Sequence, residues 1–525
     1  MKNYIKYFGI LALGMVACEP EFENPVNEPG AYTSGEANFA NYVAIGNSMT
    51  AGYSDGALFI TGQQNSFPNI MAQQFAIVGG GEFTQPLMAD NAGGLLLNGT
   101  QITSNRRVLA INAQGVPAPA VYGGTPTTEV MDHLTGPFNN LGAPGAKSYH
   151  LMAPGYGNVA GVAAGMANPY FARFASSAET TILADALAQD PTFFSLWIGN
   201  NDVLGYATAG GSGEDQTGNM NPASYGSNDI TDPQVFASVY SQLVNQLTAT
   251  GADGVLINIP DVTTLPYFTT IPNNALVLDA ASAASLTGFF QAVAGVFTAG
   301  LMQQGVPAAQ AQALAAQYAI TFNEGPNRFL IDVPVSQTNP LGFRQMTEEE
   351  LLVLTINQGA LAQGYGSVVL TPEVMQVLGV LQTGGQPTPE QAQLLLGAVS
   401  GIDDKDVLDA SEITAVETAT TAYNSTIQGL ATANNLAFVD VNSLLNQVNT
   451  TGVPFDGGVI TSTFATGGAF SLDGVHPTPR GQAFIANSVI EAINETYHAS
   501  VPKVNIGAYP TITPSNNIQY ILIDL

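Results

Sequence analysis

The sequence predicts an α/β fold in which helices cover both faces of a parallel β-sheet. Two observations indicate it: short apolar runs rich in β-branched and aromatic residues, and segments with apolar residues at helical spacing that alternate with them. Strands of a parallel sheet are buried on both faces, so they are continuously apolar. The 525 residues suffice for one such domain with a large insertion.

The predicted strands and helices follow one another along the chain. The strands are YVAIG (42–46), TFFSLWIG (192–199), GVLINIP (254–260) and LAFVDV (436–441). The helices before the last three strands lie around 182–187, around 236–247 and over about 411–434. A Gly-, Ser-, Asn- and Asp-rich stretch, 205–233, is predicted to be a loop.

Residues 266–410 interrupt this alternation and are rich in Ala, Leu, Gln and Gly. We expect a mostly helical insertion beside the active edge of the sheet. Helices are expected to begin at Thr347, followed by Glu350, and at Thr388, followed by Glu390. The sequence leaves open whether the insertion is a structural subdomain or a lid over a substrate.

The charge of the chain argues against nucleic acid as a partner. Asp and Glu number 40 against 11 Lys and Arg, a net charge of −29, so no basic surface is available to neutralise phosphates. Charged residues make up only 10% of the chain, against about 25% in an average soluble protein. An uncharged polar surface of this kind is typical of extracellular proteins.

The first residues predict export and attachment to a membrane. Residues 1–17 combine two lysines with a short apolar run, as a signal peptide does. LGMVAC resembles a bacterial lipobox, which implies that Cys18, the only cysteine, is lipidated and anchors the chain. The acidic, Pro-containing stretch 18–38 resembles the tether of surface-displayed lipoproteins. We therefore expect a lipoprotein of the outer membrane, exposed at the cell surface.

The chain contains four histidines, and one of them lies in a sequence context suited to catalysis. SLDGVHP places Asp473 three residues before His476 in a Gly-containing turn, where a carboxylate can meet an imidazole. Pro477 and Pro479 then fix the backbone at the start of the last predicted helix. His133 and His498 are expected at the surface.

Three further residues complete a candidate site for acyl transfer. Ser48 follows the first predicted strand, where the start of a helix favours developing negative charge, although such a serine can also be a simple helix cap. In NLGAPGAKS, Gly145 can present its backbone N–H without a side chain in the way. In IGNNDVL, the amide of Asn201 is available as a donor.

These four blocks, GNSMTAGY, NLGAPGAKS, IGNNDV and DGVHP, resemble those of the SGNH (GDSL-type) hydrolases. The resemblance covers 39–265 and 411–500 and implies a flavodoxin-like, three-layer fold. It implies Ser48 as nucleophile, His476 as base and Asp473 as its orienting partner. The N–H groups of Ser48 and Gly145 and the side chain of Asn201 would form the oxyanion hole. The sequence departs from the family at Asn47, where the family name has Asp.

The resemblance implies a serine ester hydrolase of the lipase or acylhydrolase type, with an acyl-enzyme intermediate and neither metal nor cofactor. Its substrate would be an ester of a lipid acyl chain or an acylated glycan. Two alternatives stay open: a carbohydrate O-acetyl esterase, and a non-catalytic surface lipoprotein that binds glycan or lipid. The acidic stretch 401–412 lacks the ligand spacing of a calcium loop. We expect Trp197 in the core and Lys147 as a solvated partner of an acid. The last residues of the tail, 501–525, could add an edge strand.

Overall fold

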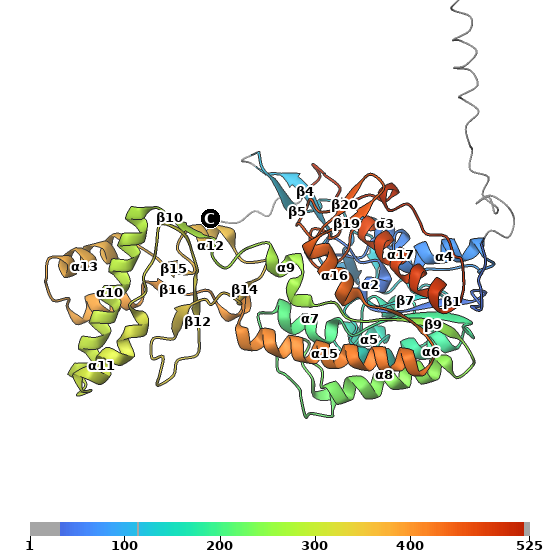
Figure 1. The fold of residues 1–525 in the computed structure, drawn as a ribbon, viewed down its shortest axis with the longest axis horizontal. Helices are drawn as coiled ribbons and strands as arrows, with labels where there is room; N and C mark the ends of the chain where they lie inside the picture. The colour runs from blue at the N-terminus through green and yellow to red at the C-terminus, as the bar shows by residue number, and fades with distance from the viewer. Residues whose placement is uncertain (1–31, 113–114, 519–525) are drawn as a thin grey trace, which may run out of the picture.

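The computed structural model describes residues 32–112 and 115–518, arranged as a body with an elongated lobe beside it (Figure 1). A parallel sheet of five strands forms the centre of the body, in the order β18-β9-β8-β1-β7. The strands are β1 (Tyr42–Gly46), β7 (Asn140–Gly142), β8 (Phe193–Trp197), β9 (Asp253–Ile257) and β18 (Ala437–Val439). The predicted α/β class with a parallel sheet is confirmed. In chain order the sheet reads 2-1-3-4-5, a common doubly wound arrangement.

Helices cover both faces of this sheet. In β1, Val43 and Ile45 point to one face and Tyr42 and Ala44 to the other, as the period of a strand requires. The first face packs on α6 (Ile182–Leu187), α8 (Pro233–Thr248) and α15 (Ala410–Ala433). The second packs on α4 (Phe67–Ile77) and α17 (Pro479–Thr496). Every residue of β1 and β8 is buried, which explains their mostly apolar sequence; the one polar residue, Ser195, is hydrogen-bonded to the Tyr42 hydroxyl.

Shorter elements surround the sheet within the body. The helices are α2 (Ser48–Ala51), α3 (Ile60–Gln64), α5 (Val159–Val162), α7 (Asn201–Thr208) and α16 (Val441–Thr450). The strands form three small sheets outside the central one: β2 (Leu95–Leu97) with β3 (Thr100–Gln101) and β6 (Thr128–Glu129), β4 (Arg107–Ile111) with β5 (Pro117–Val121), and β19 (Val453–Phe455) with β20 (Gly458–Ile460).

The insertion forms the lobe, and it contains more strands than the sequence predicted. Its helices are α9 (Pro266–Thr269), α10 (Ala280–Gln303), α11 (Ala308–Ala315), α12 (Gln358–Ala362), α13 (Pro372–Gln382) and α14 (Pro389–Leu396). Between them lie antiparallel pairs: β10 (Leu276–Leu278) with β11 (Gly325–Asn327), β12 (Leu330–Asp332) with β13 (Phe343–Gln345), β14 (Leu351–Leu352) with β17 (Val407–Leu408), and β15 (Ser367–Val368) with β16 (Val399–Ser400).

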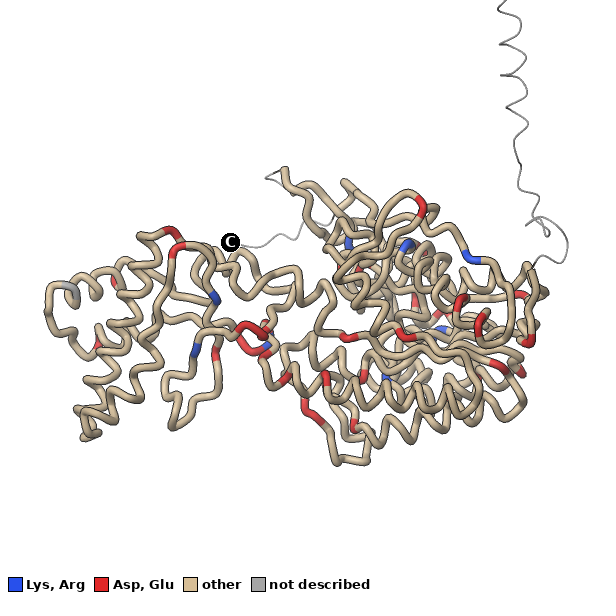
Figure 2. The backbone as a smooth tube through the Cα atoms, viewed as in Figure 1, with Lys and Arg blue, Asp and Glu red and all other residues tan. Residues whose placement is uncertain are grey.

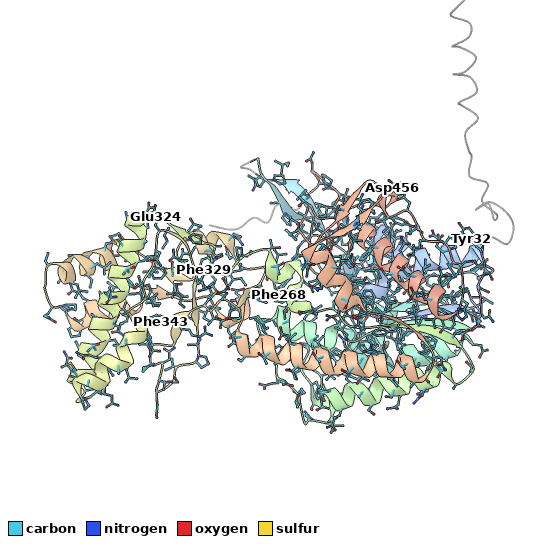
Figure 3. All side chains as sticks on the ribbon, viewed as in Figure 1. Tyr32, Phe268, Glu324, Phe329, Phe343 and Asp456 are labelled. Carbon is cyan, nitrogen blue, oxygen red and sulfur yellow. The ribbon has the colours of Figure 1, made fainter. Side chains whose placement is uncertain are left out.

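The lobe has a hydrophobic core of its own. Phe289, Phe290 and Val293 of α10 pack there with Tyr318 and Phe343. Figure 3 shows Phe343 inside the lobe and Phe268 where the lobe meets the body. By length and composition α10 is the one helix among the described residues that could cross a membrane, a test that a core helix also passes.

One predicted helix start in the lobe is correct and the other is wrong. Thr388 caps α14, with its hydroxyl accepting from the N–H of Gln391. No helix begins at Thr347. The Glu350 carboxylate is buried. Its two oxygens accept hydrogen bonds from the Arg344 guanidinium at 2.5 and 2.9 Å, and one of them also accepts from the Thr347 N–H. Glu350 therefore fixes a loop, and the chain continues into β14.

Charged groups are sparse, and acidic residues gather where the lobe joins the body (Figure 2). Two side chains of the acidic stretch 401–412 accept hydrogen bonds from the backbone at this joint: Asp409 caps α15, and Glu412 accepts from the Asp409 N–H.

Both ends of the chain extend past the described residues. The predicted signal peptide, Cys18, the predicted tether up to residue 31 and the last residues of the tail lie outside them. The described part of the tail runs along the β4–β5 pair, with bridges from Leu109 to Pro514 and from Tyr122 to Ile518.

Candidate active site

Ser48 is the first residue of α2, at the end of the turn that follows β1. Asn47 caps this helix, because its Oδ1 accepts a hydrogen bond from the Met49 N–H at 3.0 Å. Its Nδ2 donates to Asn200 Oδ1 at 3.0 Å, which ties the turn to the loop after β8. An asparagine at this position therefore fixes the serine turn from both of its side-chain atoms.

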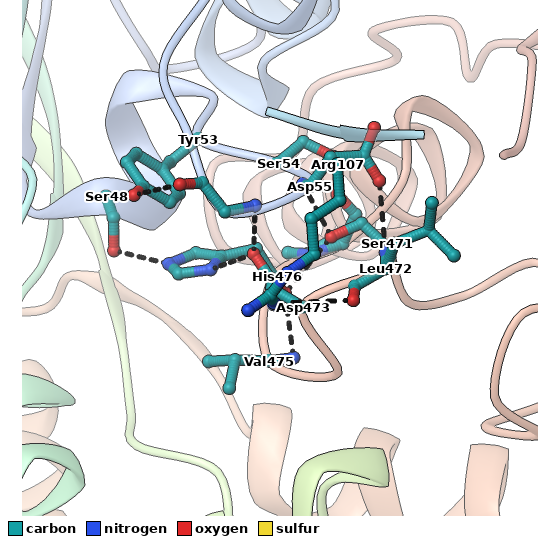
Figure 4. Close-up of polar contacts among 12 residues, drawn as sticks. Ser48, Tyr53, Ser54, Asp55, Arg107, Ser471, Leu472, Asp473, Val475 and His476 are labelled. Carbon is teal, nitrogen blue, oxygen red and sulfur yellow. Dashed lines mark hydrogen bonds and ion pairs between the residues drawn. The ribbon is translucent and has the colours of Figure 1, made fainter. Parts of the chain in front are cut away.

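The imidazole of His476 lies between Ser48 and Asp473 (Figure 4). His476 Nε2 is 2.9 Å from Ser48 Oγ, and Nδ1 is 2.9 Å from Asp473 Oδ2. A carboxylate that accepts from Nδ1–H leaves Nε2 as an acceptor, which is the tautomer that a general base requires. The structure thus brings together two residues, Ser48 and His476, that are 428 positions apart in the chain.

Asp473 is held by several donors in addition to the imidazole. Its Oδ1 accepts from the N–H groups of Val475 and His476 and from the Ser471 hydroxyl, and its Oδ2 accepts from the Gly56 N–H. Burial alone raises the pKa of this carboxyl. The favourable interaction with the His476 imidazole and these hydrogen bonds outweigh burial and hold the pKa well below its usual value. Asp473 is therefore ionised throughout the physiological range.

A second carboxylate, Asp55, supports the Asp473 turn, and no sequence motif predicts it. Asp55 Oδ1 accepts from the Leu472 N–H at 3.0 Å, and the Asp55 N–H donates to Ser471 Oγ at 2.8 Å. Burial raises the pKa of Asp55 to about 6, and the neighbouring charge of Asp473 adds to this effect. Its partners lie 417 and 416 positions away, so no local pattern could reveal the contact.

Gly145 lies on the loop after β7 and Asn201 is the first residue of α7, which follows β8; β7 and β8 are the two strands that flank β1 in the sheet. The register places the ends of the three strands at one level. Gly145 has a φ of +82°, and no atom lies within 4 Å of the place of a Cβ, so its backbone is uncovered. Asn201 Nδ2 donates to the Ala146 carbonyl at 2.9 Å, which uses one of its two hydrogens.

The loop that carries Gly145 is anchored by Asp202 of α7. This fully buried carboxylate accepts from the Ser148 N–H at 2.8 Å and from the Ser148 hydroxyl at 2.7 Å. The prediction for Lys147 was wrong: it is 3% exposed and donates from Nζ to the Asp229 carbonyl at 2.6 Å. Burial lowers the pKa of Lys147, and the charges of Asp202 and Asp229 oppose that shift.

The other histidines have different surroundings. His133 and His498 are exposed, as expected. His150 is stacked on Tyr156 and accepts from the Lys147 N–H at 3.0 Å; burial lowers its pKa to about 4. Within 32–112 and 115–518, no group of three or more His, Cys, Asp or Glu side chains is arranged to hold a metal ion.

Comparison of the chain with known protein families, with curated proteins and with solved structures found no match.

Proposed function

We propose that this chain is a serine ester hydrolase with the flavodoxin-like, three-layer fold and the four motif blocks of the SGNH type. The observation that carries the proposal is the line of two 2.9 Å hydrogen bonds from Ser48 through His476 to Asp473. A hydroxyl, an imidazole and a buried carboxylate in that order are the parts needed for attack on an acyl carbon.

In the proposed reaction, Ser48 Oγ attacks the carbonyl carbon of the ester and its proton passes to His476 Nε2. The carbonyl oxygen becomes an oxyanion, which the N–H groups of Ser48 and Gly145 and the amide of Asn201 would stabilise. When the oxyanion collapses, the alcohol leaves with the proton from His476. Water then loses a proton to His476 and attacks the acyl-serine, which releases the acid and restores Ser48.

Asp473 supports both proton transfers from its fixed position. The donors around it keep it ionised and hold its Oδ2 on Nδ1 of His476. An ionised neighbour stabilises the imidazolium that forms in each half of the reaction. The base is therefore oriented before a substrate binds.

The proposal includes attachment to the outer membrane through a lipidated Cys18, a residue outside the described range. It rests on the lipobox and the acidic tether of the sequence. A Cys18→Ser variant should leave the membrane fraction of the producing cells. Recovery of the variant with outer membranes in the same amount would contradict the anchor.

The activity is tested with p-nitrophenyl esters and the full-length chain in detergent. Ser48→Ala should reduce kcat by about 10⁴-fold or more. His133→Gln, a change at an exposed histidine, should leave kcat unaltered and serves as the control. Equal rates for the native chain and Ser48→Ala would overturn the enzyme proposal and favour the alternative of a non-catalytic binding protein.

A further inference from the structure

An apolar cavity of about 80 Å³ opens beside the Ser48–His476 pair. Its walls come from the body: Leu444, Leu445 and Val448 of α16 on one side, and Phe484 and Ile485 of α17 on the other. Ser48 and His476 themselves line it. A group that fills the cavity is therefore in contact with the proposed nucleophile.

Two of the few polar side-chain atoms at the cavity already have partners within the protein. Asn200 Oδ1 accepts from Asn47, and the buried indole of Trp197 donates to the Asn258 carbonyl at 3.0 Å. The remaining walls, apart from Ser48 and His476, are aliphatic, aromatic, Met, Pro or Gly. Such a cavity has little to offer the hydroxyl groups of a sugar, because a buried hydroxyl without a partner loses free energy. It suits a hydrocarbon chain.

We infer that this cavity binds the acyl chain of the ester substrate, and that the enzyme prefers medium-length acyl groups. The inference rests on the proposed function, since it places the acyl group on the side of Ser48 that leads between α16 and α17. The alcohol portion then lies outside the cavity. Acyl specificity is thereby assigned to the body.

The volume limits the length of the chain. At roughly 10–15 Å³ for each water-sized position, the cavity accommodates about six methylene-sized groups. An acetyl group would leave most of it empty, and a long fatty acyl chain would extend into solvent. We therefore expect the best substrates between butanoyl and octanoyl esters.

None of the described residues that line the cavity belongs to 266–410. Val262 and Leu265, just before the insertion, are the nearest contributors in sequence. The alternative that the insertion is a lid over the substrate therefore receives no support from the lining of this cavity.

The test measures kcat/KM for p-nitrophenyl acetate, butanoate, hexanoate, octanoate and dodecanoate with the full-length chain. We expect a rise of about fourfold for each added methylene up to hexanoate, and no gain beyond octanoate. Leu444→Trp places a bulky indole ring at a half-buried position in the cavity wall. It should lower hexanoate turnover by about tenfold relative to acetate. Val448→Ala enlarges the cavity and should move the optimum to longer chains.

Asn446→Trp is the matched control, because Asn446 is an exposed residue of the same helix and does not line the cavity. It should leave the chain-length profile unchanged. Hydrolysis that depends on Ser48 but is fastest with acetate, or flat across the series, would overturn the acyl cavity while the proposed function stands. A chain-length profile that neither Leu444→Trp nor Val448→Ala changes would also overturn the acyl cavity. Absence of Ser48-dependent hydrolysis with every ester would overturn the proposed function itself.

Discussion

The body and the lobe of this molecule are built in different ways. In the body, five parallel strands are buried between two layers of helices, and Ser48, Gly145 and Asn201 lie shortly after the ends of three adjacent strands. In the lobe, the strands are antiparallel pairs of two or three residues beside a separate core. Parallel strands gather distant segments at one edge, whereas the lobe has a core of its own and also packs residues such as Leu352 and Val407 into the core of the body. All the candidate catalytic groups accordingly belong to the body.

The two regions meet at the turn between Asp473 and His476. The Tyr267 N–H donates to the Gly474 carbonyl at 3.0 Å, and the Leu354 N–H donates to the Tyr267 carbonyl at 2.7 Å. Gly474 has a φ of +74°, and a Cβ there would lie 2.9 Å from Tyr267 N and from Leu354 Cδ2. The root of the lobe thus supports the catalytic turn through close backbone contact.

The largest expected effect lies in the body, at Asp473. Asp473→Asn should lower kcat by about 10⁴-fold, because a neutral amide does not stabilise the imidazolium of His476 and permits the wrong tautomer. Ester hydrolysis and the melting temperature are measured side by side. Activity within tenfold of the native chain, with the fold retained, would show that Asp473 does not orient the base.

A buried carboxylate of the lobe should behave in the opposite way. Glu350→Gln breaks the pair with Arg344 and should cost up to about 3 kcal/mol of unfolding free energy, while kcat changes little. Urea denaturation gives the first quantity and ester turnover the second. The control is Glu348→Gln, which removes an exposed carboxylate paired with Arg328 and should cost less than about 1 kcal/mol. A large loss of kcat in Glu350→Gln with unchanged stability would contradict the separation of roles.

A smaller effect is expected where the two regions touch. Gly474→Ala should reduce kcat/KM by about tenfold to 100-fold, because the new methyl must displace Tyr267 or Leu354 and shift His476. Gly251→Ala is the matched control, with a φ of +82° and no atom within 4 Å of the added Cβ. The same loss in both variants would mean that backbone strain, and not the contact with the lobe, causes it.

The smallest effect concerns Glu412, at the joint of the lobe and the body. Burial raises its pKa from 4.5 to about 7, and the charges of Asp409 and Asp404 add to that effect. The unfolded chain therefore loses this proton at lower pH than the folded chain, and unfolding free energy should fall as pH rises from about 4.5 through about 7. Glu412→Gln should remove this pH dependence, which amounts to less than about 1 kcal/mol of unfolding free energy over that range. Urea midpoints at pH 5 and pH 8 measure it; an equal slope in both proteins would contradict the assignment.

The sequence predicted four of the five strands of the central sheet, because burial on both faces leaves a mostly apolar run in each. It missed β7, whose three residues begin with a buried Asn. It failed for the strands of the lobe. A pair such as β14 and β17 has two residues in each strand, too few to show any periodicity. Thr347 followed by Glu350 fits the pattern of a helix start. The pattern does not include Arg344, with which Glu350 pairs instead.

The candidate site divides in the same manner. Ser48, Asp473 and His476 lie in short motifs with recognisable neighbours, and the structure places them in contact. Asp55 has no motif, since its role depends on partners at the other end of the chain. Lys147 was misjudged because a lysine is normally exposed, and only the folded loop shows the carbonyl that receives it.

The most direct test of the central claim is covalent labelling of the native chain with an alkyl fluorophosphonate, followed by peptide mapping. The reagent phosphonylates a serine whose proton is taken up by a neighbouring base. We expect one label, on Ser48, and its loss in His476→Ala. A label on another serine, or none on Ser48 in the folded protein, would contradict the account.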